Sequence, residues 1–175
     1  MEYEDILYEV RNAVVWITIN RPEKMNAFRG TTCDELIKAL NRAGYDKSIG
    51  AIVLAGAGER AFCTGGDQSA HDGNYDGRGT IGLPMEELHT AIRDVPKPVI
   101  ARVQGYAIGG GNVLCTICDL TIASEKAVCT GAGMGPAEPC PASVAPARPL
   151  AVSRAWMSAA IAALPSTAPI CLVVL

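Results

Sequence analysis

Two glycine-rich turns are the parts of this sequence best suited to chemistry. The run YAIGGGNVL places Gly109, Gly110 and Gly111 between two apolar segments, and CTGGDQ places Gly65 and Gly66 after another apolar segment. Glycines let a ligand come close to backbone N–H groups, and a helix that begins at such a turn adds the positive end of its dipole. Two such turns that face one another would direct two N–H donors at one oxygen. This is an oxyanion hole, in which each donor is worth on the order of 10²–10³ in rate.

The spacing of the glycines excludes two common nucleotide-binding turns. The triplet lacks the G-x-G-x-x-G pattern of a dinucleotide site, and no Gly-Lys-Ser/Thr follows it as in a P-loop. Close packing of a helix on a strand is an alternative role for each turn taken alone. The occurrence of both turns together favours the oxyanion hole.

The reactive side chains outside the glycines have ordinary structural interpretations. His71 and His89 are single histidines without a visible nucleophile partner. Cys63 fits a small packed residue better than a nucleophile. Asp67 could act as an acid, but an aspartate at this place more commonly bonds the backbone of its own turn.

The cysteines indicate reduced thiols. Seven cysteines without the spacing of a disulfide framework suggest a cytoplasmic protein. Cys115 and Cys118 have C-x-x-C spacing, which can mark a redox or zinc site, but no second pair or nearby histidine accompanies them. We interpret them as two small apolar residues on a helix face.

The composition is that of one globular domain with a proper core. Hydrophobic residues make up 49% of the 175 residues, and the net charge of -3 predicts neither a nucleic-acid nor an anionic-membrane partner. Glu2, Glu4 and Asp5 near the start, without an apolar run, predict that no signal peptide is present.

The elements that must position the glycine turns alternate between strands and helices. Thr32 and Glu35 form a capping box that predicts the start of a first helix, and Pro84 starts a second one. A long loop over 56–82 holds the first glycine turn, and a loop of this length is usually functional. A third helix follows the glycine triplet to about Cys118. The expected strands are Ile6–Val10 and Ala13–Asn20 as a hairpin, Ile52–Ala55, Val99–Val103, and Leu120–Ala123 as the last one. This order predicts an α/β fold with parallel crossovers.

The sequence changes character after about Val128. Seven of the eleven prolines and only three charged residues, Glu138, Arg148 and Arg154, lie between 129 and 175. We therefore divide the chain into a core over 1–128 and an atypical Ala/Pro-rich tail over 129–175 that is disordered or poorly packed. The final apolar segment is long enough for a membrane span, but Pro165 and Pro169 interrupt it, so we do not expect a membrane anchor.

Three stretches together resemble the crotonase (enoyl-CoA hydratase/isomerase) superfamily. They are RPEKMNAF, AIVLAGAGERAFCTGGD and KPVIARVQGYAIGGGNVLCTICDLTIAS, and the resemblance covers Asn20 to about Val128. It implies a crotonase-like fold of repeated ββα units and a coenzyme A thioester as substrate, with no separate cofactor and no metal. It also implies that the amides of Gly66 and Gly110 form the oxyanion hole and stabilise a thioester enolate. The residues that it places along the acyl-CoA site are Lys24, Thr64, Gly65, Asp67, Gln68, Tyr75 above the acyl group, Tyr106, Ala107, Ile108 and Gly109.

Within the superfamily, GGDQ and YAIGGGNVL with CDLTIAS resemble the branch that contains naphthoate synthase and 2-ketocyclohexanecarboxyl-CoA hydrolase. The loop that begins HDGNYDGRGTIG looks closest to the hydrolase. Family hydratases carry a glutamate where this chain has Val113, and a valine cannot hold a water or move a proton. We therefore expect hydrolytic ring cleavage to pimeloyl-CoA, as in benzoate degradation, rather than hydration. Ring closure of the naphthoate synthase type and an inactive acyl-CoA-binding fragment are the alternatives.

The resemblance ends near Val128. A Gly-Ser-x-Asp stretch is expected next, but Glu138 and Cys140 occupy that place, and the helical C-terminal part that closes the pocket and builds the family's trimers or hexamers is not recognisable. We hypothesise that the reading frame was lost near Val128, and a naturally divergent tail is the alternative. On this basis we expect low or no activity and doubt that the family's oligomers form.

Overall fold

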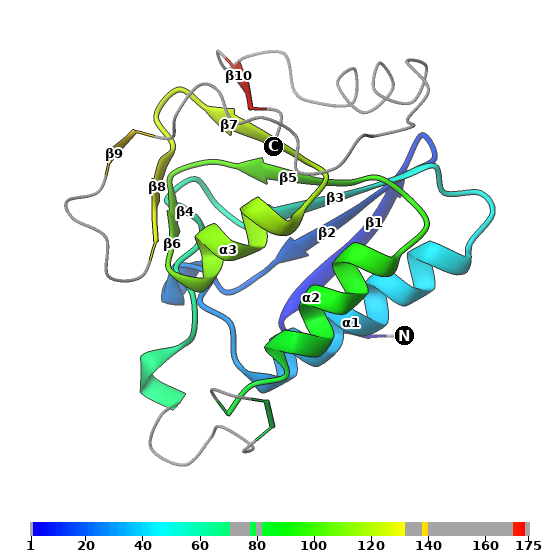
Figure 1. Ribbon diagram of the computed structural model, residues 1–175, viewed down its shortest axis with the longest axis horizontal. Coiled ribbons are helices and arrows are strands. Elements are labelled where there is room, and N and C mark those ends of the chain that lie inside the picture. Colours follow the sequence, from blue (N-terminus) through cyan, green and yellow to red (C-terminus); the bar gives the residue numbers. More distant parts are fainter. Residues whose placement is uncertain (1, 71–77, 80–81, 132–137, 140–169, 174–175) are drawn as a thin grey trace.

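A computed structural model of the chain describes residues 2–70, 78–79, 82–131, 138–139 and 170–173 (Figure 1). Its larger sheet has the strand order β1-β2-β3-β5-β7-β10. The hairpin of β1 and β2 is antiparallel with Val10 opposite Val15, and Asn12 and Ala13 adopt the positive φ that a tight hairpin turn requires. β2, β3, β5 and β7 pair in parallel, whereas β10 pairs with β7 antiparallel. The strands are β1 Ile6–Arg11, β2 Val14–Ile19, β3 Ala51–Gly56, β5 Val99–Val103, β7 Leu120–Ser124 and β10 Ile170–Val173.

Helices α1 (Gly30–Tyr45), α2 (Met85–Asp94) and α3 (Gly110–Ile117) pack on one face of this sheet (Figure 1). The apolar positions of each helix recur at helical spacing, so each has one face for the core. The buried side chains on these faces include Leu36, Ala39, Leu40 and Ala43 of α1, Leu88 and Ile92 of α2, and Leu114 and Cys115 of α3. The predicted helices and the predicted α/β class are confirmed.

A second, smaller sheet has the order β4-β6-β8-β9. β4 (Ala61–Cys63) lies inside 56–82, so the prediction of one uninterrupted loop there is wrong. β6 (Tyr106–Ile108), β8 (Val128–Thr130) and β9 (Glu138–Pro139) complete the sheet. The sequence predicted β7 as the last strand, but β8, β9 and β10 follow it. β8 also crosses the predicted boundary at 128. Strands of two or three residues are too short to show an alternating pattern, which is why the sequence did not indicate them.

The start of α1 differs from the predicted capping box. The helix begins at Gly30, and the Thr32 hydroxyl accepts a hydrogen bond from the Arg29 N–H at 3.1 Å. Glu35 does not cap the helix: its carboxylate accepts the backbone N–H groups of Glu4 at 2.7 Å and Asp5 at 2.8 Å. Glu35 therefore fastens the N-terminal segment onto α1, and that competing bond overturns the capping prediction.

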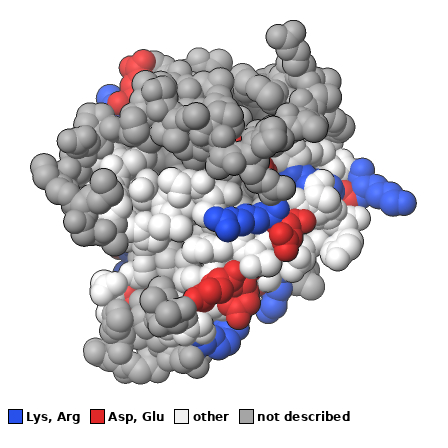
Figure 2. All heavy atoms as spheres, in the orientation of Figure 1, with Lys and Arg blue, Asp and Glu red and all other residues white. Residues whose placement is uncertain are grey.

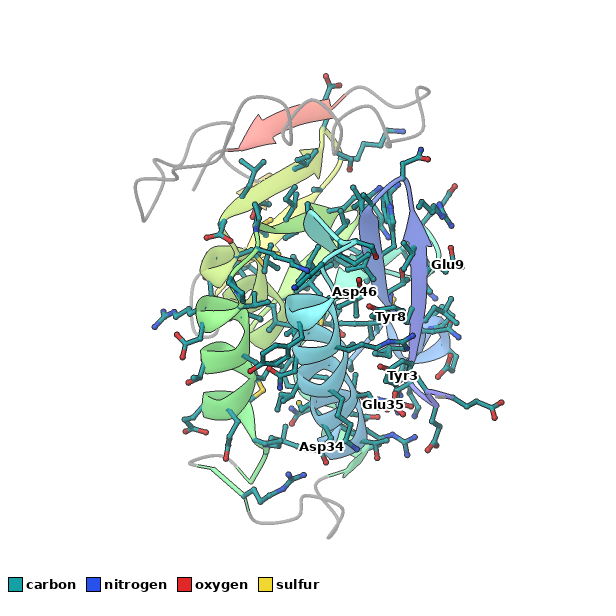
Figure 3. The ribbon with its side chains drawn as sticks, turned by 90° about the vertical axis from the view of Figure 1, so that its right-hand side faces the viewer. Tyr3, Tyr8, Glu9, Asp34, Glu35 and Asp46 are labelled. Carbon is teal, nitrogen blue, oxygen red and sulfur yellow. The ribbon has the colours of Figure 1, made fainter. Side chains whose placement is uncertain are left out.

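The same surface of α1 holds β1 through aromatic side chains (Figure 3). Tyr3 and Tyr8 stack with ring centroids 6.1 Å apart, and the guanidinium of Arg42 lies 4.3 Å from the centre of the Tyr8 ring. A cation over an aromatic face is attracted by the ring quadrupole. These contacts pack β1 against α1 at the edge of the core.

Acidic and basic side chains lie interspersed over the helical face of the molecule (Figure 2). No basic patch dominates this view of the described residues, in line with the net charge of -3. Among the helices of the described segments, none is both long and apolar enough to cross a membrane.

Candidate active site

The two predicted glycine turns come together at one edge of the smaller sheet. β4 and β6 pair in parallel, with Cys63 opposite Ala107, so the turns that follow them leave the sheet side by side. A Cβ added at Gly65 would lie 3.1 Å from the amide nitrogen of Gly110 and 3.2 Å from the carbonyl oxygen of Ile108. Gly65 also has a φ of 88°, which disfavours any other residue. The close approach of the turns therefore depends on glycine at position 65.

A neighbouring segment fixes the direction of the Gly66 N–H. Phe28 and Gly66 form a parallel bridge, in which the Phe28 N–H donates to the Gly65 carbonyl and the Asp67 N–H donates to the Phe28 carbonyl, both at 2.8 Å. The Gly65 carbonyl and the Gly66 N–H belong to one planar trans peptide unit, so they point in opposite directions. Since the carbonyl points at Phe28, the Gly66 N–H points away from it.

The Gly110 N–H is directed in the same way by helix α3. The Gly109 carbonyl accepts the Val113 N–H at 3.1 Å, so it points along the helix. The Gly110 N–H shares that peptide unit and points out of the helix N-terminus, where the first N–H groups have no intrahelical acceptor. Gly109 has a φ of 55°, and its own N–H donates to Thr130 of β8 at 3.0 Å. Both N–H groups are thus available for an acceptor outside the backbone network of the described residues.

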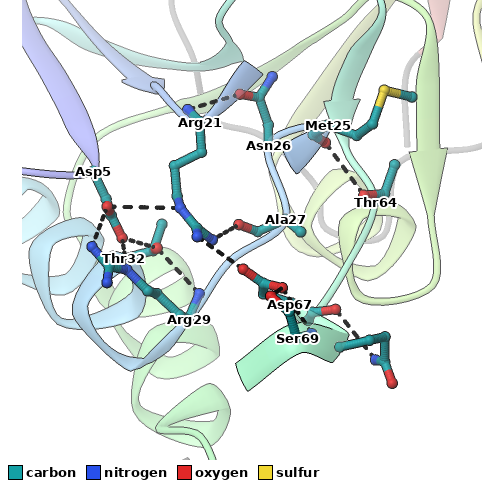
Figure 4. A network of polar contacts seen from close by, with 12 residues as sticks. Asp5, Arg21, Met25, Asn26, Ala27, Arg29, Thr32, Thr64, Asp67 and Ser69 are labelled. Atoms are coloured by element: carbon teal, nitrogen blue, oxygen red, sulfur yellow. Dashed lines mark hydrogen bonds and ion pairs between the residues drawn. The ribbon is translucent and has the colours of Figure 1, made fainter. Parts of the chain in front are cut away.

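A largely buried ion pair joins Arg21 to Asp67, the residue after Gly66 (Figure 4). The Arg21 guanidinium donates from Nη2 to Oδ2 of Asp67 at 2.8 Å and from Nη1 to the Ala27 carbonyl at 2.5 Å. The other carboxylate oxygen of Asp67 accepts both the N–H and the hydroxyl of Ser69. Burial pushes the pKa of Asp67 upward, but the hydrogen bonds from Ser69 and Arg21 outweigh it and hold the pKa below its usual value. Asp67 is therefore an ionised structural partner of Arg21.

The remaining predicted site residues lie around the two turns in different ways. The Thr64 hydroxyl donates to the Met25 carbonyl at 3.3 Å, and the Gln68 amide donates to the Gly66 carbonyl at 3.3 Å. Lys24 is exposed in the short helix η1 (Pro22–Lys24), and Tyr106 is 43% exposed at the start of β6.

The two residues that follow Tyr106 differ in exposure, since the Ala107 side chain is fully buried and Ile108 is half-buried. Tyr75 and His71 lie outside the described residues. His89 is half-buried on α2, where burial and then the charge of Arg93 lower its pKa.

The cysteines near the site are inert packing residues. Cys63 is completely buried, and burial raises the pKa of its thiol to about 12, so it is not a thiolate nucleophile at neutral pH. The thiols of Cys115 and Cys118 donate to the carbonyls of Gly111 and Leu114, one helical turn earlier. Within the described segments, no group of three or more His, Cys, Asp or Glu residues is placed to hold a metal ion.

Val113 stands on the first turn of α3, close in sequence to the Gly110 amide, and is 38% exposed. Its side chain has no proton to give or accept. Position 113 therefore supplies no acid–base group beside the second glycine turn.

Sequence reasoning missed three residues that hold the site. Arg21 and Phe28 act as described above. Asn26 accepts the Arg21 N–H with Oδ1 at 3.1 Å and donates Nδ2 to the carbonyls of Ala57 at 2.9 Å and Ala61 at 2.8 Å. The partners are far apart in sequence, so no local pattern indicates these bonds. A buried Asn26 with a positive φ of 56° ties the segment before α1 to the start of β4.

Comparisons with known proteins identify the family of this chain. Residues 9–136 match the family model of enoyl-CoA hydratase/isomerase. An enoyl-CoA hydratase/isomerase from Xanthobacter autotrophicus Py2 is similar in structure, with 34% identity, a TM-score of 0.66, and coverage of 74% of this chain and 49% of its own. An enoyl-CoA hydratase from Mycobacterium avium subsp. paratuberculosis K-10 has 30% identity, a TM-score of 0.65, and coverage of 74% and 51%.

An enoyl-CoA hydratase/carnithine racemase from Magnetospirillum magneticum has 28% identity, a TM-score of 0.68, and coverage of 74% and 50%. The chain thus spans about half the length of these proteins. The fold, the paired glycine turns and the family match lead to one conclusion: this chain belongs to the enoyl-CoA hydratase/isomerase family.

Proposed function

We propose that this chain binds an acyl-CoA thioester and that the Gly66 and Gly110 N–H groups donate to its carbonyl oxygen. The observation that carries the proposal is the contact of the two turns, in which position 65 lies against the amide of Gly110 while neighbouring bonds direct both N–H groups outward. Donors fixed in advance stabilise the negative charge that develops on the oxygen when a thioester becomes an enolate. Coenzyme A enters as part of the substrate, and no separate cofactor is required.

The coenzyme A part of the substrate would extend along the exposed residues beside the turns. Lys24 lies in the segment that leads to Phe28 and can meet a phosphate, while Thr64 and Gln68 flank the glycines. Tyr106 presents a partly exposed ring at the start of β6, the strand that leads to the second glycine turn. An ammonium group beside a phosphate, together with donors at a helix N-terminus, suits a polyanionic ligand.

The reaction that we propose is hydrolytic ring cleavage of a cyclic β-keto acyl-CoA, with 2-ketocyclohexanecarboxyl-CoA giving pimeloyl-CoA. Water adds to the ring ketone, the bond between that carbon and the α-carbon breaks, and its electron pair becomes the thioester enolate. Protonation of the α-carbon completes the balance. Val113 supports this choice over hydration, because a glutamate is absent where hydration would use one.

Binding without turnover is a second candidate, and a specific observation favours it. The carboxylate that directly follows Gly66 is Asp67, and it is held by Arg21 and Ser69. The chain also spans about half the length of its relatives. A chain with the donors but without a proton-transfer group would bind acyl-CoA and leave it unchanged.

Infrared difference spectroscopy with a ¹³C-labelled thioester carbonyl tests the donors directly. Polarisation by the two N–H groups should move the carbonyl band of bound cyclohexanecarbonyl-CoA to lower frequency. Gly110→Pro and Gly110→Ala are a matched pair, because both add a Cβ and only the first removes the N–H. The band should return towards its solution frequency in Gly110→Pro alone; equal bands in both variants would contradict the proposal.

Turnover assays separate the candidate reactions. Loss of 2-ketocyclohexanecarboxyl-CoA with formation of pimeloyl-CoA supports ring cleavage, whereas a naphthoyl product from an open-chain precursor supports ring closure. Calorimetric binding of both thioesters without any product supports the binding-only candidate.

A further inference from the structure

One side chain contacts both segments of the parallel bridge between Phe28 and Gly66. Arg21 follows β2, and its side chain is 12% exposed. One arm of its guanidinium donates to the carbonyl of Ala27, the residue before Phe28, and the other arm donates to the side chain of Asp67, the residue after Gly66. Arg21 therefore contacts both sides of the bridge that directs the Gly66 N–H.

The Arg21 guanidinium bonds two acceptors at once, from Nη1 to the Ala27 carbonyl and from Nη2 to the Asp67 carboxylate. The single ammonium group of a lysine could not reproduce this pair of bonds. A guanidinium is planar and rigid, and its donors reach two acceptors at a fixed angle, whereas an ammonium offers one mobile centre. Asp67 is also fixed from its other oxygen by Ser69, at 3.0 Å from the N–H and 2.6 Å from the hydroxyl. Movement of Arg21 would thus be passed to both segments of the Phe28–Gly66 bridge, through the Ala27 carbonyl and the Asp67 side chain.

A second ion pair in the same network provides a comparison. Arg29 contacts Asp5 from Nε and from Nη2, both at 2.9 Å, and Asp5 also accepts the Thr32 hydroxyl at 2.5 Å. This pair joins the N-terminal segment to the first turn of α1, and Asp5 also lies 3.8 Å from Nε of Arg21 (Figure 4). Arg29 shares the chemistry of Arg21, but its guanidinium hydrogen bonds go to Asp5 and Glu4 of the N-terminal segment.

We infer that Arg21, through Asp67 and the Ala27 carbonyl, is a positioning residue that sets the direction of the Gly66 N–H towards the thioester oxygen. The inference rests on the proposed function, since it gives Arg21 a role only if Gly66 is a donor. Arg21 does not touch the substrate, and its effect passes through the Phe28–Gly66 bridge.

The test compares two ligands on the full chain. Cyclohexanecarbonyl-CoA carries the carbonyl, and the matching cyclohexylmethyl-CoA thioether has a methylene in its place. Their dissociation constants are measured by calorimetry for the unaltered chain and for Arg21→Lys, Asp67→Asn and Arg29→Lys. The ratio of the two constants reports the interaction with the oxygen and cancels any general loss of folded protein.

The expected result is a preference for the thioester in the unaltered chain. That preference should fall roughly 3- to 10-fold in Arg21→Lys and Asp67→Asn, which is the net value of a hydrogen bond expressed as a ratio. It should stay unchanged in Arg29→Lys. The ¹³C carbonyl band of the bound thioester should shift towards its solution frequency in the first two variants and not in the third.

The possible failures differ from one another. If the unaltered chain shows no preference and no band shift, the proposed function is wrong and the inference falls with it. A second failure is that the unaltered chain shows the thioester preference and the band shift while the Arg21 and Asp67 variants behave like Arg29→Lys. In that case the proposal that Gly66 and Gly110 donate to the carbonyl is retained, and the positioning role of Arg21 is overturned. Asp67→Asn keeps the size of the side chain and carries the comparison by itself if Arg21→Lys does not fold.

Discussion

The ring of Phe28 lies directly against the α-carbon side of Gly110. A Cβ added at position 110 would come within 2.6 Å of Cζ and 3.0 Å of Cε1 of that ring. Phe28 is 1% exposed, so its ring has little space in which to retreat. One residue thus contacts both glycine turns, with its backbone at Gly65 and Asp67 and its ring at Gly110.

Gly110→Ala should therefore lower the free energy of unfolding by about 1–3 kcal/mol, the usual cost of overpacking a core. Denaturation in urea measures the change. Phe28→Leu provides space at the same point, so the double variant Gly110→Ala/Phe28→Leu should be less destabilised than the sum of the two single variants. Strict additivity would show that the ring contact is not the source of the cost.

Lys97 should stabilise the end of α1. Its ammonium Nζ donates to the carbonyls of Ala43 and Asp46, where a helix leaves carbonyls without partners and carries a negative dipole end. We expect Lys97→Met to cost about 1 kcal/mol in the free energy of unfolding. Lys38→Met, at an exposed position on the same helix, is the control and should change little. Equal costs would assign no capping role to Lys97.

Cys63 should resist alkylation in the folded chain. Burial raises the pKa of its thiol to about 12, so both its accessibility and its thiolate fraction at pH 8 are very low. Mass spectrometry after iodoacetamide treatment should find Cys63 unmodified without denaturant and fully modified in guanidinium chloride. Cys129, which is only partly buried, should be modified sooner. Rapid labelling of Cys63 under native conditions would contradict its placement beneath the glycine turn.

The stability that Asp67 contributes should depend on pH. Its pKa is lower in the folded chain than the ordinary 3.8, so the folded state favours the ionised form. The contribution is complete above the unfolded value and is lost as the pH falls below 3.8 through the folded value. The difference in unfolding free energy between the unaltered chain and Asp67→Asn should therefore shrink as the pH falls from 6 towards 3. A difference that stays constant over this range would show that the charge of Asp67 is not what stabilises the fold.

Sequence periodicity predicted the long elements because each carries its pattern within itself. Leu36 and Leu40 of α1 and Leu88 and Ile92 of α2 recur at helical spacing, and β3 and β5 are short apolar runs. β4, β6 and β8 have three residues each, and their pairing depends on segments that are distant in sequence. The smaller sheet that brings the glycine turns together was therefore not predictable from local pattern.

The glycines themselves were recognisable, but the residues that hold them were not. Gly65 and Gly110 are unusual enough in sequence to indicate a backbone site. Arg21 and Asp67 are ordinary charges 46 positions apart, and only the fold brings them together. For Glu35 the local pattern was misleading, because its spacing from Thr32 predicted a capping box. In the structure its carboxylate instead accepts two N–H groups of the N-terminal segment.

The two outward N–H groups are each oriented by a bond at the opposite end of their own peptide unit, to Phe28 in one case and Val113 in the other. Peptide units are common to every residue, so side chains near the two turns can be exchanged while the two N–H groups keep their direction. Engineering of this scaffold for new acyl groups should accordingly begin with side chains such as Tyr106 and Val113 and leave the segment from Arg21 to Phe28 intact.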